Sequence, residues 1–188
     1  MQVVLITVYN GNTGVVRLLC QEYGVDADCS TSETLEEPPL KGITPLYWAA
    51  VKGHVELVKL LIYSTEKGVN ARCANDGAIP LYIAAQNGHT EVVKMLMDHK
   101  ADVNASRRTG ATPLWIAAQD GHTEVVKLLL DHKADVNARR CTDNATPLYV
   151  AVQNGHTELV KLLLDHKADL NESMDTGSTP LRRRDILK

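Results

Sequence analysis

Hydrophobic and polar residues follow one another in blocks along this chain, and one order of blocks recurs. In its clearest form, a short run of mostly small and aliphatic residues at 114–118 precedes a Gly-His pair and a more apolar run at 125–130. A polar stretch at 131–140 then leads to the next run. Because glycine beside a polar residue interrupts a helical pattern, this order predicts a helix, a turn, a second helix and an extended loop.

The start of each helix has its own sequence signal. Thr112 can accept a backbone hydrogen bond in the first turn, and Pro113 suits the first helical position, where no N–H bond is lost. Thr123 is expected to cap the second helix, with Glu124 near the positive end of its dipole. The run 125–130 is too apolar for a helix with three solvated sides, so we expect this helix to be buried on more than one side.

The same unit is written several times in succession. Residues 110–143 align with 77–109 upstream and with 144–176 downstream. Prolines 33 to 35 residues apart mark the period: Pro45, Pro80, Pro113, Pro147 and Pro180. Two helices of about 8 to 10 residues cannot bury such apolar surface alone, so neighbouring units are expected to stack into an all-α solenoid.

These motifs strongly resemble the ankyrin repeat. The family's Thr-Pro-Leu-His-x-Ala is similar to segments 44–49, 112–117 and 146–151, and a weaker copy has Ile79 in place of threonine. Gly-His, Val-Val-Lys-Leu-Leu and Ala-Asp-Val-Asn-Ala recur in register, and the resemblance covers roughly residues 1–181. It implies antiparallel helix pairs, β-hairpin loops that project at about right angles, and a concave face.

We expect a single ankyrin-repeat domain over residues 1–188. Its repeats are 42–76, 77–109, 110–143 and 144–176, after a degenerate repeat at 1–41 and before a partial repeat or cap at 177–188. An acidic, proline-containing insertion at 28–41 is either a solvated loop or a recognition loop over the first hairpin. The apolar residues 3–6 favour the cut edge of a longer protein over a natural cap.

Three repeats depart from the family pattern after the second helix, where ankyrin repeats usually have a left-handed glycine. The position holds Lys100, Lys133 or Lys167. A residue with a side chain costs up to about 1 kcal/mol there, although lysine interacts favourably with the negative end of the helix dipole. Glycine at these positions should therefore stabilise the array.

Composition narrows the possible functions. The net charge of −3 opposes general nucleic-acid binding, although arginines beside Trp115 are compatible with it. No signal peptide or apolar run of membrane-spanning length is present, so we expect no membrane partner. The cysteines form no Cys-x-x-Cys motif, and reduced thiols predict a cytoplasmic or nuclear location. They are Cys20, Cys29, Cys73 and Cys141.

Nothing in the sequence indicates catalysis. It contains no His-Glu-x-x-His, phosphate-loop, dinucleotide-binding or nucleophile-elbow motif. All seven histidines occupy repeat positions, which favours hydrogen bonding at helix turns over metal binding. We therefore predict no enzyme activity, no catalytic or metal-binding residue and no cofactor.

An aromatic residue stands where the family usually has histidine, near the start of each first helix. These residues are Tyr47, Tyr82, Trp115 and Tyr149. They either pack between repeats or form amphipathic anchors on the concave face, because Tyr and Trp are favoured interface residues.

The loop tips vary most between units. In the ankyrin family, varied tip residues and residues beside the Gly-His turn commonly contact partners. At the tips, the candidates are Arg72, Asn75, Asp76, Arg107, Arg108, Arg139, Arg140 and Asp143; beside the turns, they are Lys52, Asn87, Asp120 and Asn154. The arginines make this edge either a basic solvated face or a groove for an acidic protein surface.

Together these features predict a monomeric, non-catalytic scaffold that binds another protein through its concave face and hairpin tips. The alternative is that the chain is the targeting part of a larger regulator. Such a regulator could be a ubiquitin-ligase receptor or a bacterial or viral effector, with its active domain outside these residues.

Overall fold

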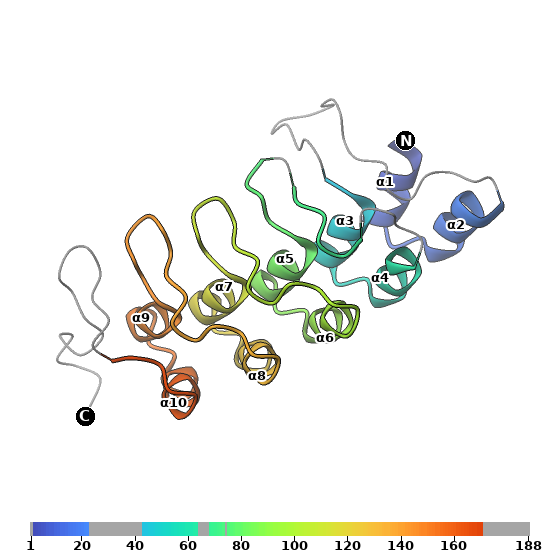
Figure 1. The fold of residues 1–188 in the computed structure, drawn as a ribbon. Coiled ribbons are helices and arrows are strands. Elements are labelled where there is room, and N and C mark those ends of the chain that lie inside the picture. The colour runs from blue at the N-terminus through green and yellow to red at the C-terminus, as the bar shows by residue number, and fades with distance from the viewer. Residues whose placement is uncertain (1, 23–42, 64–67, 74, 171–188) are drawn as a thin grey trace. The chain divides into compact units, whose positions relative to one another are not determined.

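The structure, a computed structural model, describes residues 2–22, 43–63, 68–73 and 75–170. The described residues form ten α-helices and one π-helical turn (Figure 1), and no β-strand is assigned among them. They belong to two compact units, 1–102 and 103–188. The inserted segment 28–41 and the last segment 177–188, for which the sequence suggested specific roles, lie outside the described residues.

Unit 1 contains three helix pairs. Their bounds are α1 (Gln2–Tyr9), α2 (Thr13–Arg17) with the π-helical turn η1 (Leu18–Glu22), α3 (Pro45–Lys52), α4 (Val55–Ile62), α5 (Pro80–Gln86) and α6 (Thr90–Asp98). The first helix of the middle pair, α3, packs against both α1 and α5, and α4 packs against α2 and α6. Like helices therefore stack on like helices within the unit.

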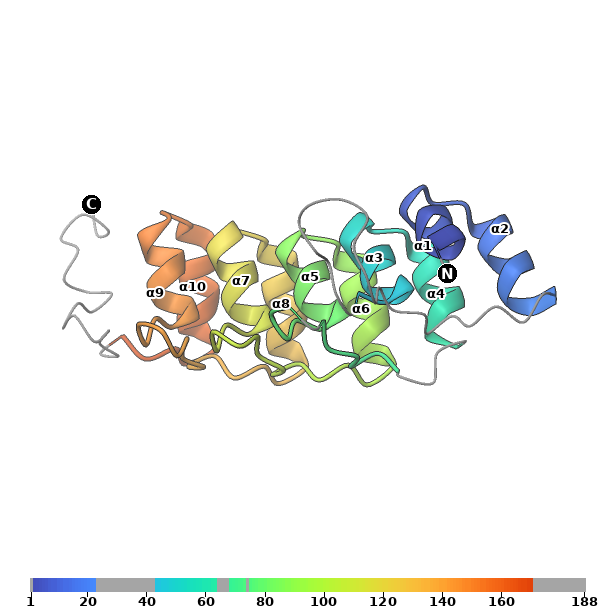
Figure 2. The same cartoon turned by 90° about the horizontal axis from the view of Figure 1, so that it is seen from above.

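Unit 2 repeats this arrangement with two helix pairs. They are α7 (Pro113–Asp120) with α8 (Thr123–Asp131), and α9 (Pro147–Gln153) with α10 (Thr157–Asp165). Helix α7 packs against α9 and α8 against α10, while the two helices of each pair lie side by side (Figure 2). The predicted all-α architecture of stacked helix pairs is confirmed.

The core of each unit follows from the two apolar runs of the repeat. Small residues of the first helices are completely buried, as Ala84 and Ala85 in unit 1 and Ala117 in unit 2 show. Their short side chains allow neighbouring first helices to approach closely. The second helices supply larger buried residues, such as Leu129 in α8 and Leu163 in α10. Within each unit, small side chains therefore fill the contacts between first helices, and larger side chains fill the contacts of the second helices.

The predicted threonine cap is confirmed in the first helices that have a threonine before their proline, and it is wrong for the second helices. Thr112 Oγ1 accepts the backbone N–H of Trp115 at 3.2 Å, and Thr146 does the same for Tyr149 at 3.2 Å. Helix α8, however, already begins at Thr123, and the residue before it, His122, makes no side-chain cap. Thr123 is therefore the first helical residue, with helical rather than extended backbone geometry, and cannot act as the cap.

The lysines after the second helices do adopt the left-handed conformation. Lys100, Lys133 and Lys167 have φ of 65°, 67° and 67°. At each site two backbone bonds close the helix: in unit 2, Lys133 N–H donates to the Leu130 carbonyl at 3.0 Å and Ala134 N–H to Leu129 at 2.9 Å. This is the Schellman pattern that glycine usually ends, so the departure from the family is real and carries backbone strain.

The Gly-His pairs connect consecutive repeats. His156 Nε2 donates to the Gln119 carbonyl oxygen at 3.0 Å, and in unit 1 His89 Nε2 reaches the Val51 carbonyl oxygen at 3.0 Å. A Cβ added at Gly121 would lie 2.6 Å from the His156 ring. These contacts confirm hydrogen bonding at the helix turns, and they show that the glycine of one repeat makes room for the histidine of the next.

The loops before α7 and α9 turn as hairpins, but no β-strand is assigned among the described residues, so the expected β-hairpins are not formed there. In the loop before α9, Arg140 N–H donates to the Ala145 carbonyl at 3.1 Å, and Asn144, with φ of 57°, forms the turn. Asparagine ladders hold successive loops together instead. Asn137 Oδ1, for example, accepts the Asp169 N–H at 2.9 Å.

We expect Lys133→Gly to increase the free energy of unfolding by about 0.5–1 kcal/mol, because glycine adopts positive φ without steric cost. Urea denaturation followed by circular dichroism would measure the change. Lys133→Ala keeps a Cβ at the strained position and should give no gain. An equal gain from alanine would attribute the effect to removal of the lysine rather than to the backbone.

Gly121→Ala and Gly155→Ala form a matched pair. Both glycines have positive φ, 79° and 75°, but their surroundings differ: within the described residues, a Cβ at Gly121 would meet the next repeat's His156, whereas a Cβ at Gly155 would meet no atom within 4 Å. We expect Gly155→Ala to cost about 1 kcal/mol from backbone strain and Gly121→Ala a further ~1–3 kcal/mol from overpacking. Adding His156→Ala should recover part of that further cost; equal costs in the two single variants would contradict the proposed contact.

Candidate functional site

The aromatic residues of the first helices differ in exposure. Tyr82 and Trp115 are only 2% and 3% exposed, whereas Tyr47 and Tyr149 are half-buried. In unit 2, the Trp115 indole N–H donates to the Ala145 carbonyl oxygen in the following loop at 2.9 Å. Burial favours the packing interpretation at Tyr82 and Trp115, and makes Tyr47 and Tyr149 the more exposed of the four aromatic residues.

Two neighbouring side chains, Asp143 and Trp115, hold Arg140 in its loop. Its Nε donates to Asp143 Oδ1 at 2.9 Å, and a second contact joins Nη2 to Oδ2 of the same carboxylate. Its guanidinium carbon lies 4.3 Å from the centre of the Trp115 ring, within the range of a cation–π interaction. The side chain therefore has a structural role in addition to any contact with a partner.

The ion pair with Arg140 also lowers the pKa of Asp143. The hydrogen bond from Arg140 holds the pKa of the Asp143 carboxyl below its ordinary value of 3.8, helped by a bond from the Ala145 N–H and opposed by partial burial. The carboxylate is thus ionised over the physiological range and neutralises the guanidinium beside it.

The remaining tip candidates are unequal in exposure. Arg72 Nη1 donates to the Gly77 carbonyl oxygen at 3.0 Å within its own loop, and Asp76 Oδ1 accepts the Ala78 N–H at 3.0 Å. Arg107 is half-buried. The most exposed tip candidates are Asn75 and Arg72 in unit 1, and Arg108 and Arg139 in unit 2.

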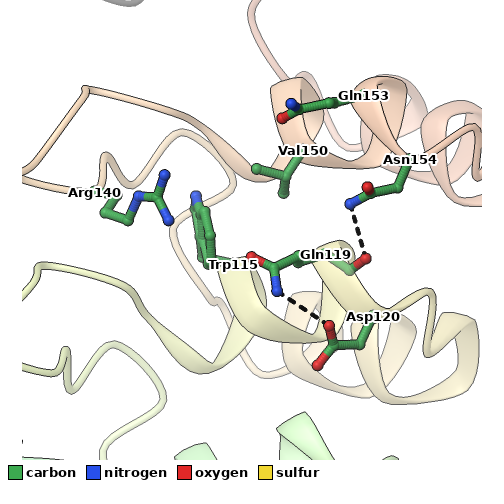
Figure 3. A pocket seen from close by; sticks show the side chains of 7 residues that line it. All are labelled: Trp115, Gln119, Asp120, Arg140, Val150, Gln153 and Asn154. Carbon is green, nitrogen blue, oxygen red and sulfur yellow. Dashed lines mark hydrogen bonds between the residues drawn. The ribbon is translucent and has the colours of Figure 1, made fainter.

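A pocket of about 340 Å³ opens on the face that α7 and α9 form in unit 2. Figure 3 shows its lining: side chains from both helices converge on the space, and Arg140 projects toward it from the loop between the pairs. The seven lining residues are Trp115, Gln119, Asp120, Arg140, Val150, Gln153 and Asn154. Four of them were candidates from sequence, and the structure brings these four together: Trp115, Asp120, Arg140 and Asn154.

Hydrogen bonds fix the polar wall of this pocket. Asn154 Nδ2 donates to the Gln119 carbonyl oxygen at 3.0 Å, the same oxygen that accepts from His156. The Gln119 side-chain amide donates to Asp120 Oδ1 at 3.2 Å (Figure 3). The groups are therefore oriented before any ligand arrives. Sequence reasoning missed Gln119 and Gln153, although both directly precede a predicted contact position.

Unit 1 carries a different cluster at the corresponding helix ends. The Lys52 ammonium lies 4.0 Å from the centre of the Tyr9 ring, and Tyr9 meets Trp48 edge to face at 5.4 Å. Tyr9 is 48% exposed. Sequence reasoning identified Lys52 but missed both aromatic residues. A usable signal existed at Trp48, because the equivalent positions in later repeats hold Ile83, Ile116 and Val150.

Neither a metal centre nor a membrane-spanning helix is found in the described part of the chain. No group of three or more His, Cys, Asp or Glu side chains there is arranged to hold a metal ion. No helix in the same part of the chain combines the length and apolar character needed to cross a membrane.

Comparison with protein families identifies the class to which this chain belongs. The family model for ankyrin repeats, which spans three copies, matches residues 4–107 and 105–174. The chain is therefore a member of the ankyrin-repeat family, as its motifs indicated. Members of this family generally act as protein–protein interaction modules and are typically non-catalytic. A search of curated proteins gives no match.

Asp143→Asn is expected to destabilise the fold modestly at pH 7, by less than about 1 kcal/mol, because the ion pair is partly exposed. The pKa of this carboxyl is lowered in the folded state, so its stabilisation is present above the unfolded pKa of about 3.9 and is lost as pH falls through the folded value. The stability difference from the unmodified chain should therefore shrink below pH 4.

Urea denaturation at pH 7, 5 and 3.5 would measure this difference. Asp131→Asn, which removes an exposed carboxylate from α8, is the control. A difference for Asp143→Asn that does not change with pH would rule out a contribution from the ionised carboxylate.

Proposed function

We propose that this chain is a non-catalytic interaction module that binds a partner protein through the α7–α9 pocket and the neighbouring loop tips. The observation that carries the proposal is the pocket itself, in which hydrogen bonds already orient the side chains of Gln119, Asp120 and Asn154. Its lining comes from consecutive repeats, so the site exists only where the repeats are stacked. Preorganisation of this kind lowers the entropic cost of binding.

The tips extend the proposed surface. The exposed Arg108 and Arg139 support contact with acidic side chains of the partner, since arginine binds carboxylates through two parallel hydrogen bonds.

We further propose that the repeats act together as one domain, and that the protein is monomeric and located in the cytoplasm or nucleus. Three of the cysteines, Cys20, Cys73 and Cys141, lie among the described residues, and thiols at these positions are compatible with such a reducing compartment.

The alternative is that the same surface selects the target of a larger regulator whose active domain lies outside these residues. Both versions require a protein ligand at the pocket and tips, so the same binding experiment tests the surface.

Three variants separate this surface from the rest of unit 2. Asp120→Lys changes the pocket and Arg108→Ala with Arg139→Ala changes the tips, whereas Glu124→Lys makes the same charge reversal on the second helix α8. We expect a protein captured from cell lysate by the intact chain and by Glu124→Lys to be depleted about tenfold or more with Asp120→Lys or the arginine variant. Quantitative mass spectrometry of the captured proteins is the measurement, with folding checked by circular dichroism.

Equal capture by all four chains would reject the proposed surface. Loss with Glu124→Lys alone would move the binding site to the second helices.

A further inference from the structure

We propose that the α7–α9 pocket receives a single cationic side chain, lysine or arginine, from the partner protein, with Asp120 as its acceptor. This inference rests on the proposed function, because it names the group that fills the same pocket. It assigns the pocket a preference opposite to that of the tips, where exposed arginines suit acidic groups.

The positive charge in the pocket wall is already neutralised. Arg140 donates to the Asp143 carboxylate through Nε and Nη2, and its guanidinium carbon lies 4.3 Å from the centre of the Trp115 ring. An anion entering the pocket would compete with Asp143, which is held in place by a backbone N–H as well. Arg140 therefore forms a wall of the pocket but attracts anions only weakly.

The formal charges of the seven lining residues sum to zero, but Arg140 is paired with Asp143 outside the lining, so the negative charge of Asp120 is left unbalanced. Asp120 is the only other charged residue among the seven, its side chain is exposed, and no described cation lies within ion-pair distance. One of its oxygens accepts from Gln119, which orients the carboxylate. A cation in the pocket would give this carboxylate the charged partner that it lacks.

The amide groups add acceptors. Gln119 uses its side-chain nitrogen to donate to Asp120, and Asn154 uses its own to donate to the Gln119 backbone carbonyl. Each amide is thereby oriented by its nitrogen and presents its oxygen to an incoming donor. An ammonium or guanidinium group has only donors, so it complements these oxygens better than a carboxylate does.

The electrostatic field of the backbone also favours a positive charge in the pocket. Helix α7 ends at Asp120 and α9 ends at Gln153, so four lining residues lie in or directly after a last helical turn. The C-terminal end of a helix carries partial negative charge and stabilises nearby cations. Val150 and Trp115 are both only 3% exposed, so they offer the aliphatic stem of a basic side chain a small apolar surface at the base of the pocket. A volume of about 340 Å³ is at the low end of the ~300–1,000 Å³ typical of ligand pockets, and therefore suits one side chain.

The corresponding position of unit 1 shows that this feature belongs to one repeat rather than to the fold. There Lys52 replaces the aspartate and lies over Tyr9. A site of this kind in unit 1 would already contain its own cation. The proposed preference therefore depends on Asp120 itself.

Blocked pentapeptides of sequence Gly-Ala-Xaa-Ala-Gly, with Xaa as Lys, Arg, Gln or Glu, are the probes. They would be titrated into the full isotope-labelled chain and followed by nuclear magnetic resonance. The chain has two tryptophans, so the Trp115 indole N–H reports on the pocket and the Trp48 indole N–H serves as an internal control. We expect the Lys or Arg peptide to shift the Trp115 and Asn154 side-chain signals without shifting Trp48, and the two peptides to show which cation is preferred.

Asp120→Asn should weaken this binding about tenfold or more, because a hydrogen-bonded charge pair is lost, whereas Asp120→Glu should retain most of it. Glu124→Gln on α8 is the matched control and should bind as the intact chain does. Circular dichroism checks that each variant is folded. Equal binding of the Glu or Gln peptide, or no Trp115 shift with either cationic peptide, would overturn the inference.

The outcome can be separated from that of the proposed function. If no cationic peptide binds while capture of a partner still depends on Asp120, the interaction surface stands and the cation preference is rejected. If the peptides bind through Asp120 while the captured proteins are the same for every variant, the cation preference stands and the wider surface is rejected.

Discussion

Each helix pair of this protein depends on its neighbour, because neither helix can bury its own apolar face. The contact between the glycine of one turn and the histidine of the next shows how closely the repeats fit. Gly121 has no side chain, so the His156 ring lies against its backbone and donates to the Gln119 carbonyl. Small residues of the first helices and the asparagine bonds between loops extend the same fit across each layer. Stacking is therefore the condition under which the other features exist.

The close packing of the repeats also determines which positions can differ in sequence from one repeat to the next. The buried positions of the repeat are fixed by packing, but the residue at or directly after the end of each first helix from α3 to α9 is exposed. The position holds Lys52 in one repeat and Asp120 in another, with opposite charge and different neighbours. The scaffold thus tolerates a change of sign there without a change of fold, which is how a common framework can present different binding surfaces.

Several predictions from the sequence turned out differently in the structure, because they depended on contacts that a sequence pattern does not reveal. Thr123 has the side chain of a helix cap, but the helix already begins at that residue. The Trp115 indole could have been exposed, yet the next loop supplies both a carbonyl acceptor and an arginine above the ring. Arg140 adds to a basic edge when charges are counted, whereas its pairing with Asp143 removes most of that charge. In each case a residue from a neighbouring turn or loop determined the outcome.

The sequence by itself determined the period, the helix pairs, the threonine caps of the first helices and the left-handed lysines, because these depend on local hydrogen bonding and on backbone preference within one repeat. Tertiary structure decided which aromatic residues are buried, that Gln119 and Asp120 share a pocket with Arg140, and that Tyr9 and Trp48 meet near Lys52. The physical reason is the length scale. These relations join residues about 20 to 40 positions apart, and only the stacking of one repeat on the next brings such residues into contact.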